Sequence, residues 1–198
     1  MENSALIVVD MLYDFIDGSL ACTNGENAVT KCVDFINNLS FGVSKTSESD
    51  EDILDTYPII FIRDFHPITH CSFKENGGIW PNHCVEGTHG SEIHKDLQPY
   101  VKEELVFYKG RDPQKEQYSG FEGKNEAGQS LLEVLELMDI ENIYLCGIAT
   151  EYCVKNTLLD LKANGFRLKL ISDALAYIDI EGHNQTLKEL KEQNIQII

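Results

Sequence analysis

Short, mostly apolar runs recur along this sequence, and they constrain its fold more than any other feature. They cover residues 5–9, 58–62, 105–108, 142–146 and 167–171. Continuous apolar runs of this length are typical of strands that are buried on both faces, as in parallel sheets. Consecutive parallel strands need a crossover, which is usually a helix. The runs therefore predict alternating strands and helices.

Amphipathic segments lie between these runs, as this prediction requires. Helical spacing of apolar residues marks 28–39 and 131–138, and another helix follows Cys153 and ends at Asn164-Gly165. A final helix includes Leu187 and Leu190, and 195–198 is a last short strand. We therefore expect an α/β fold of three layers, α/β/α, with a central, mostly parallel, Rossmann-like sheet.

The length of 198 residues fits one domain, 1–198, and the polar, acidic stretch at about 40–56 is interpreted as a loop insert. Asp and Glu number 33 against 16 Lys and Arg, a formal net charge of −17. Such a surface repels phosphate backbones and anionic lipids, which argues against nucleic-acid and membrane partners. A homo-oligomer is left open.

The sequence contains 6 cysteines, but nothing else in it indicates a secreted, disulfide-bonded protein. Its N-terminus lacks a basic region and a long apolar segment, and no apolar stretch is long enough to span a membrane. We therefore expect a cytoplasmic protein with reduced thiols, in which a special cysteine would bind metal or act in catalysis.

Ligands of such sheets bind beyond the carboxyl ends of the strands, so residues directly after the apolar runs are candidates for function. Asp10 and Lys109 both stand there. A carboxylate leaving an apolar strand is costly to bury without a cation, and Lys109 is the candidate partner. The pair is either purely structural or part of an active site.

A second candidate is Asp64-Phe65-His66, which follows another apolar run. In extended backbone, positions i and i+2 point to the same side, so the carboxylate and the imidazole could share a cation. Further histidines downstream, among them His70 and His83, would complete a site for Zn²⁺, Fe²⁺ or Mn²⁺. The alternative is a polar loop whose histidines only make hydrogen bonds.

The third candidate is Cys153, at the expected start of a helix after the run 142–146. Unpaired N–H groups and the positive helix end favour a thiolate there, Lys109 would lower the thiol pKa further, and the same N–H groups could hold an oxyanion. This is the position that a nucleophilic cysteine needs. A small buried thiol that packs the helix on the sheet is an equal alternative.

Taken in order, these pieces resemble the nicotinamidase branch of the isochorismatase-like cysteine hydrolases, over nearly the whole chain. The piece Trp80-Pro81-Asn82-His83-Cys84 separates this branch from its metal-free relatives. The other pieces are Val8-Val9-Asp10-Met11, Asp14-Phe15, Arg63-Asp64-Phe65-His66-Pro67, His70-Cys71-Ser72-Phe73, Lys109-Gly110 and Gly147-Ile148-Ala149-Thr150-Glu151-Tyr152-Cys153-Val154.

The resemblance implies a role for each matching residue. Asp10, Lys109 and Cys153 match the catalytic triad, and a cis peptide at Ile148-Ala149 would turn the Ala149 N–H, together with that of Cys153, into an oxyanion hole. The implied reaction converts nicotinamide to nicotinate and ammonia through a Cys153 thioester, as in NAD salvage.

The resemblance also implies one divalent metal ion, with zinc favoured and iron or manganese as alternatives. Asp64, His66 and His83 match its ligands, and His70 matches a position that ligates metal in some members. Phe15 and Trp80 match the aromatic residues that flank the pyridine ring.

One departure from the family pattern is the pair Leu12-Tyr13, which stands where a Gln-Asn pair is common. Three other interpretations compete: a related amidase acting on another small amide, a non-enzymatic metal-binding protein with the same fold, and a redox sensor that uses Cys153. The predicted metal ligands argue against the first, and the complete triad argues against the second.

Overall fold

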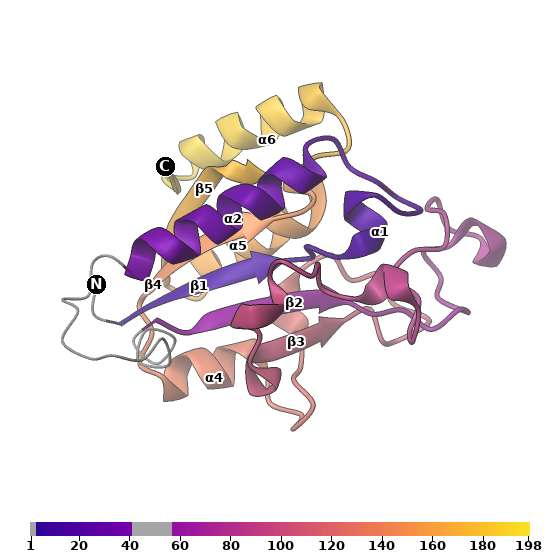
Figure 1. The fold of residues 1–198 in the computed structure, drawn as a ribbon, viewed down its shortest axis with the longest axis horizontal. Helices are drawn as coiled ribbons and strands as arrows, with labels where there is room; N and C mark the ends of the chain where they lie inside the picture. Colours follow the sequence, from indigo (N-terminus) through magenta and orange to yellow (C-terminus); the bar gives the residue numbers. More distant parts are fainter. Residues whose placement is uncertain (1–2, 41–56) are drawn as a thin grey trace.

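A six-stranded parallel sheet forms the centre of the computed structural model, which describes residues 3–40 and 57–198 (Figure 1). The strand order is β3-β2-β1-β4-β5-β6, and every neighbouring pair is parallel. The strands are β1 (Ser4–Val9), β2 (Ile59–Asp64), β3 (Val106–Lys109), β4 (Asn142–Gly147), β5 (Arg167–Leu175) and β6 (Gln196–Ile197). Each predicted strand is present.

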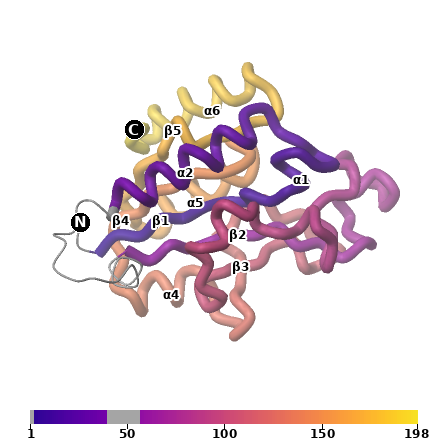
Figure 2. The backbone as a smooth tube through the Cα atoms, in the orientation of Figure 1, coloured from indigo at the N-terminus to yellow at the C-terminus, as the bar shows by residue number. Residues whose placement is uncertain are grey.

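Helices cover both faces of the sheet, which confirms the three-layer prediction. In the tube view, α2 crosses in front of the strands and α5 lies behind them (Figure 2). The α-helices are α1 (Tyr13–Ile16), α2 (Gly25–Ser40), α4 (Leu131–Leu137), α5 (Lys155–Ala163) and α6 (Ile180–Glu192). Single 3₁₀ turns occupy Lys74–Asn76, His89–Ser91, Gln98–Tyr100, Glu103–Leu105 and Gly120–Glu122, and a π-helical turn occupies Thr150–Val154.

The two faces of β1 show why its run is continuously apolar. Leu6 and Val8 pack in one buried cluster with α2, whereas Ile7 and Val9 pack in a second cluster with α4 and α5. A strand between two helical layers has no solvent-exposed face and therefore needs no polar alternation. None of the helices in the described ranges combines the length and the apolar character that a bilayer crossing requires.

The strand order also indicates where a ligand would bind. The chain runs from β1 outward to β2 and β3 and then returns to β4 on the other side of β1. Parallel sheets leave a crevice at such a switch point, beyond the carboxyl ends of the strands. The long connection 65–105, with no strand and only single helical turns, begins at this end of the sheet before it returns to the start of β3 (Figure 1). The predicted acidic insert, apart from Ser40, falls outside the described residues.

Candidate active site

The sheet register brings three polar strand ends together. Asp10 directly follows β1, and its Oδ1 accepts the backbone N–H of Asp64 at 2.8 Å. Asp64 ends β2 and is paired in register with Lys109, the last residue of β3. All three side chains are at most 6% exposed. Residues more than fifty positions apart thus become neighbours because parallel strands end at a common edge.

Lys109 joins the two carboxylates. Its Nζ lies 2.9 Å from Asp10 Oδ2, 2.9 Å from Asp64 Oδ1 and 3.5 Å from Cys153 Sγ. An ammonium group has three donors, and these three contacts use all of them. The expected partnership of Asp10 and Lys109 is therefore present. We call Asp10, Lys109 and Cys153 the lysine group.

Burial and charge shift the pKa values of these groups in different directions. Burial alone would lower the pKa of Lys109, but Asp10 and Asp64 outweigh it and hold that pKa well above its usual value. Burial would raise the pKa of Asp64, but Lys109 and His66 hold it well below the usual value. Lys109 is therefore a cation and Asp64 a carboxylate near neutral pH.

For Asp10 and Cys153, in contrast, the effect of burial on the pKa outweighs that of the nearby cation. Burial raises the pKa of Asp10 above its usual value despite the attraction of Lys109. Burial also raises the pKa of the Cys153 thiol well above its usual value. Lys109 does lower the pKa of this thiol, as expected from the sequence, but burial outweighs that effect. A protonated thiol beside a carboxylate of raised pKa is suited to transfer its proton to that carboxylate.

A widened turn carries Cys153 from β4 to α5. Residues Thr150–Val154 are π-helical, with the Val154 N–H donating to Ala149 C=O at 3.2 Å, so the α-helix begins two residues later than expected from the sequence. The peptide bond Ile148-Ala149 is cis, as the resemblance predicted. Within the described residues, no hydrogen bond uses the Ala149 N–H, which leaves this donor available beside Cys153.

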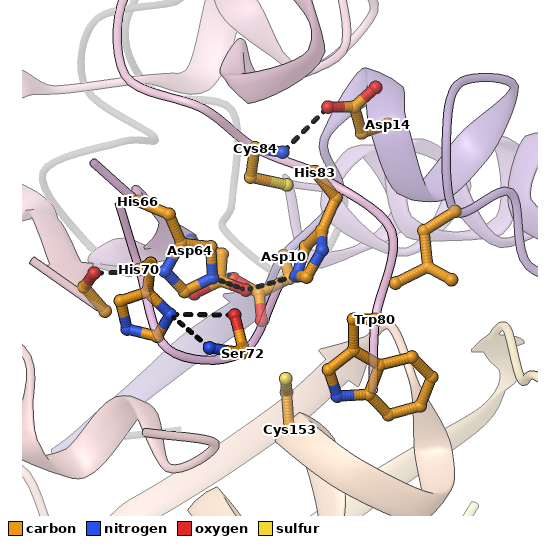
Figure 3. A network of polar contacts seen from close by, with 12 residues as sticks. Asp10, Asp14, Asp64, His66, His70, Ser72, Trp80, His83, Cys84 and Cys153 are labelled. Carbon is orange, nitrogen blue, oxygen red and sulfur yellow. Dashed lines mark hydrogen bonds and ion pairs between the residues drawn. The ribbon is translucent and has the colours of Figure 1, made fainter. Parts of the chain in front are cut away.

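Asp64, His66 and His83 form a second group, which we call the imidazole cluster. Their candidate ligand atoms lie within 4.8 Å of one another. Asp64 Oδ2 is 3.0 Å from His66 Nε2 and 3.7 Å from His83 Nε2 (Figure 3). The three side chains are buried.

The outer ring nitrogens of the cluster are held by the backbone. Nδ1 of His66 is 3.0 Å from Gly110 C=O, and Nδ1 of His83 is 2.7 Å from Pro81 C=O. With each Nδ1 donating to its carbonyl, Nε2 would be free to bind a metal ion beside Asp64, which is the usual second-shell arrangement of a metal-binding histidine. One carboxylate and two imidazoles with open positions fit a divalent metal ion of the zinc, iron or manganese type.

His70 lies beside this cluster but is engaged elsewhere. Its ring centroid is 4.1 Å from that of His66. However, its Nδ1 is 2.7 Å from Ser72 Oγ and its Nε2 is 3.1 Å from Lys115 C=O. Both ring nitrogens are occupied, so the structure does not bring His70 into the cluster. The sequence could not show this, because Lys115 is far away along the chain.

A pocket opens at the contact between the two groups. Phe15 and Trp80, which the resemblance places beside the pyridine ring, line this pocket, and the Phe15 ring centroid lies 5.4 Å from that of His83. The remaining lining residues are Leu20, Cys22, Asp64, His83, Glu116, Gln117, Tyr118, Ala149, Tyr152, Cys153 and Ile178. Residues of both groups therefore face one cavity.

Sequence reasoning missed two residues of this wall. Tyr118 Oη accepts the indole N–H of Trp80 at 3.1 Å and so fixes the plane of that ring. Gln117 Oε1 accepts the N–H of Gly110 at 3.0 Å, next to the carbonyl that holds His66. Both stand in an irregular segment, where no periodicity indicates which side chains turn inward.

Several known proteins are similar to this chain over nearly its whole length. The isochorismatase domain profile matches residues 4–198. The nicotinamidase/pyrazinamidase of Mycobacterium tuberculosis is 31% identical, over 98% of this chain and 97% of that protein. The pyrazinamidase of Pyrococcus horikoshii, solved in complex with zinc, has a TM-score of 0.81 and 35% identity, covering 99% of this chain and 98% of that one. PnC1 from L. infantum, solved in complex with nicotinate, has a TM-score of 0.82 and 29% identity, covering 99% and 92%.

Proposed function

The chain belongs to the isochorismatase family, and on that premise we propose that it hydrolyses nicotinamide to nicotinate and ammonia, with Cys153 as the nucleophile. One observation carries this proposal: the lysine group and the imidazole cluster meet in one aromatic-walled pocket. A relative that binds nicotinate and relatives that are nicotinamidases support the choice of substrate.

The imidazole cluster holds one divalent metal ion, and we propose that this ion is zinc. The donor set fits zinc, and the Pyrococcus horikoshii relative was solved with zinc. When bound, the ion supplies a Lewis acid for the pyridine ring nitrogen and so orients the ring. Phe15 and Trp80 contact the ring from the walls of the pocket.

The first half of the reaction forms a thioester. The Cys153 thiol gives its proton to Asp10, and the sulfur attacks the carboxamide carbon. The N–H groups of Ala149 and Cys153 stabilise the oxyanion, while Lys109 stabilises the negative charge that develops in the buried site. Asp10 returns the proton to the amide nitrogen, the C–N bond breaks, and ammonia leaves.

The second half hydrolyses the thioester. Asp10 accepts a proton from a water molecule, whose oxygen attacks the thioester carbonyl, and the C–S bond breaks. The departing Cys153 sulfur takes the proton back from Asp10, and nicotinate is released. Asp10 thus acts as base and acid in turn, a role that suits a carboxylate whose pKa is raised by burial.

We further propose that residues 1–198 form a single domain, which the match of the family profile to 4–198 supports. A cytoplasmic location is proposed because a nucleophilic thiol must stay reduced.

The proposal is tested by measuring ammonia release from nicotinamide by the purified, zinc-loaded protein. Turnover is expected, and Cys153→Ala should abolish it while the bound metal remains. The matched control is Cys71→Ala, since this thiol is only half-buried and does not line the pocket. Absence of turnover with zinc, iron and manganese, or release of ammonia from other small amides only, would overturn the choice of substrate.

A further inference from the structure

Asp14 contacts the loop that carries His83, although nothing above gives this residue a role. Asp14 lies in α1, next to Phe15. Its Oδ2 accepts the backbone N–H of Cys84 at 2.7 Å (Figure 3). Its Oδ1 accepts the backbone N–H of Ser19 at 3.1 Å. A carboxylate that accepts backbone N–H groups makes charge-assisted hydrogen bonds, which are stronger than neutral ones.

The Cys84 peptide is the point at which both histidines of the imidazole cluster are connected. His83 directly precedes Cys84, and the C=O of Cys84 accepts the backbone N–H of His66 at 3.0 Å. Cys84 itself has a φ of +47°, a left-handed conformation that is uncommon for a residue with a side chain. Such backbone persists where its surroundings hold it, and here Asp14 supplies the hydrogen bond from one side.

The surroundings of Asp14 leave its carboxylate little room to move. A Cβ built on Gly90 would lie 2.0 Å from Asp14 Oδ2, and one built on Gly18 would lie 2.5 Å from Oδ1. The backbone therefore passes closely over the carboxylate from two directions. Since Phe15 also packs against the His83 ring, α1 contacts His83-Cys84 through two consecutive side chains.

We propose that Asp14 is a positioning residue for the imidazole cluster: through the backbone of Cys84 it sets the position of His83 and secures His66, which follows β2. This inference rests on the proposed metal-binding role of His83. It assigns to α1 the task of placing one ligand and one ring wall together. Loss of the Asp14 carboxylate should lower the affinity for the metal ion clearly, while the stability of the protein to unfolding changes little.

The test measures the zinc dissociation constant of the apo-protein by competition with a chromogenic chelator. Asp14→Ala should weaken zinc binding about 10- to 100-fold, the range typical of outer-shell partners of metal ligands. Asp14→Asn keeps an oxygen acceptor for Cys84 and should recover most of the affinity. Excess zinc should restore the turnover of Asp14→Ala.

Glu133→Ala is the matched control, because Glu133 also accepts a backbone N–H at 2.7 Å, in the capping box of α4, away from the site. It should lower the unfolding midpoint but leave the zinc affinity unchanged. Equal loss of zinc affinity in Asp14→Ala and Glu133→Ala, or wild-type affinity in Asp14→Ala, would overturn the role of Asp14 and leave the proposed function standing. If His83→Ala also keeps wild-type zinc affinity, the proposed ligand set fails as well.

Discussion

Two regions of this molecule hold the site by different means. Asp10, Asp64 and Lys109 stand at the ends of strands, where the register of a parallel sheet fixes their spacing. His83 and Trp80 stand in the long connection 65–105, where hydrogen bonds to single carbonyl or hydroxyl oxygens fix them. The strand-borne residues are thus placed by the regular ladder of the sheet, and the side chains of the loop-borne residues by individual hydrogen bonds.

Because of this difference, we expect the strand ends and the connection 65–105 to respond differently to substitution. Changes among the strand-borne residues act on buried charges and should cost both stability and activity. Changes among the residues that hold the loop should alter the binding of metal or substrate and leave the stability of the fold nearly unchanged. The predictions below test this contrast.

The largest effect is expected at Lys109. Lys109→Met leaves two buried carboxylates beside each other without their cation, which should cost about 3–5 kcal/mol of unfolding free energy and remove activity. Urea unfolding measures the loss. Lys155→Met is the control, since Lys155 pairs with Glu189 at a partly exposed site and exposed pairs contribute little. Equal stability of the two variants would contradict the proposed difference between buried and surface pairs.

A smaller effect is expected from the second thiol of the pocket, Cys22. Burial, together with the charges of Glu151 and Asp10, raises its pKa to about 12 from 9.0. The unfolded chain ionises this thiol first, so its contribution to stability is complete below pH 9 and falls as the pH rises toward 12. Between pH 9 and 10, the wild type should lose about 1 kcal/mol more than Cys22→Ala. Parallel curves in pH-dependent urea unfolding would show that the thiol ionises freely.

The smallest effect is expected at Tyr118. Tyr118→Phe removes the acceptor of the Trp80 indole N–H, so the ring loses one support at the pocket wall. KM for nicotinamide should rise roughly two- to fivefold with kcat nearly unchanged, the size expected for one partly exposed hydrogen bond. Steady-state kinetics measures this, with Tyr100→Phe as the control because its hydroxyl bonds Asn37 at an exposed site. A fall in kcat instead would place Tyr118 closer to the chemistry.

The same contrast explains what the sequence could predict. Asp10, Asp64 and Lys109 were identified because each ends an apolar run, and parallel strands share one edge. The cis peptide at Ile148-Ala149 was expected from the family resemblance, and the structure has it. The raised pKa of the Cys153 thiol could not be predicted, because it depends on burial that only the folded structure shows.

The loop contacts could not be predicted for a related reason. Asp14 and Cys84 are 70 positions apart, and Trp80 and Tyr118 are 38 apart, and neither pair is related by the register of paired strands. No hydrophobic period indicates such pairs. His70 shows the same limit: its residue type suited a metal ligand, but its ring nitrogens contact the hydroxyl of nearby Ser72 and the carbonyl of distant Lys115.

The position of Lys109 between Asp10 and Asp64 has a consequence for evolution and design. One ammonium group balances a carboxylate of each group, so the two groups are not exchangeable modules. A metal-free relative given the imidazole cluster by grafting would add a buried carboxylate to a lysine that already has a partner. Substitutions in the two groups should therefore combine non-additively, and the order in which a lineage acquires or loses them is constrained.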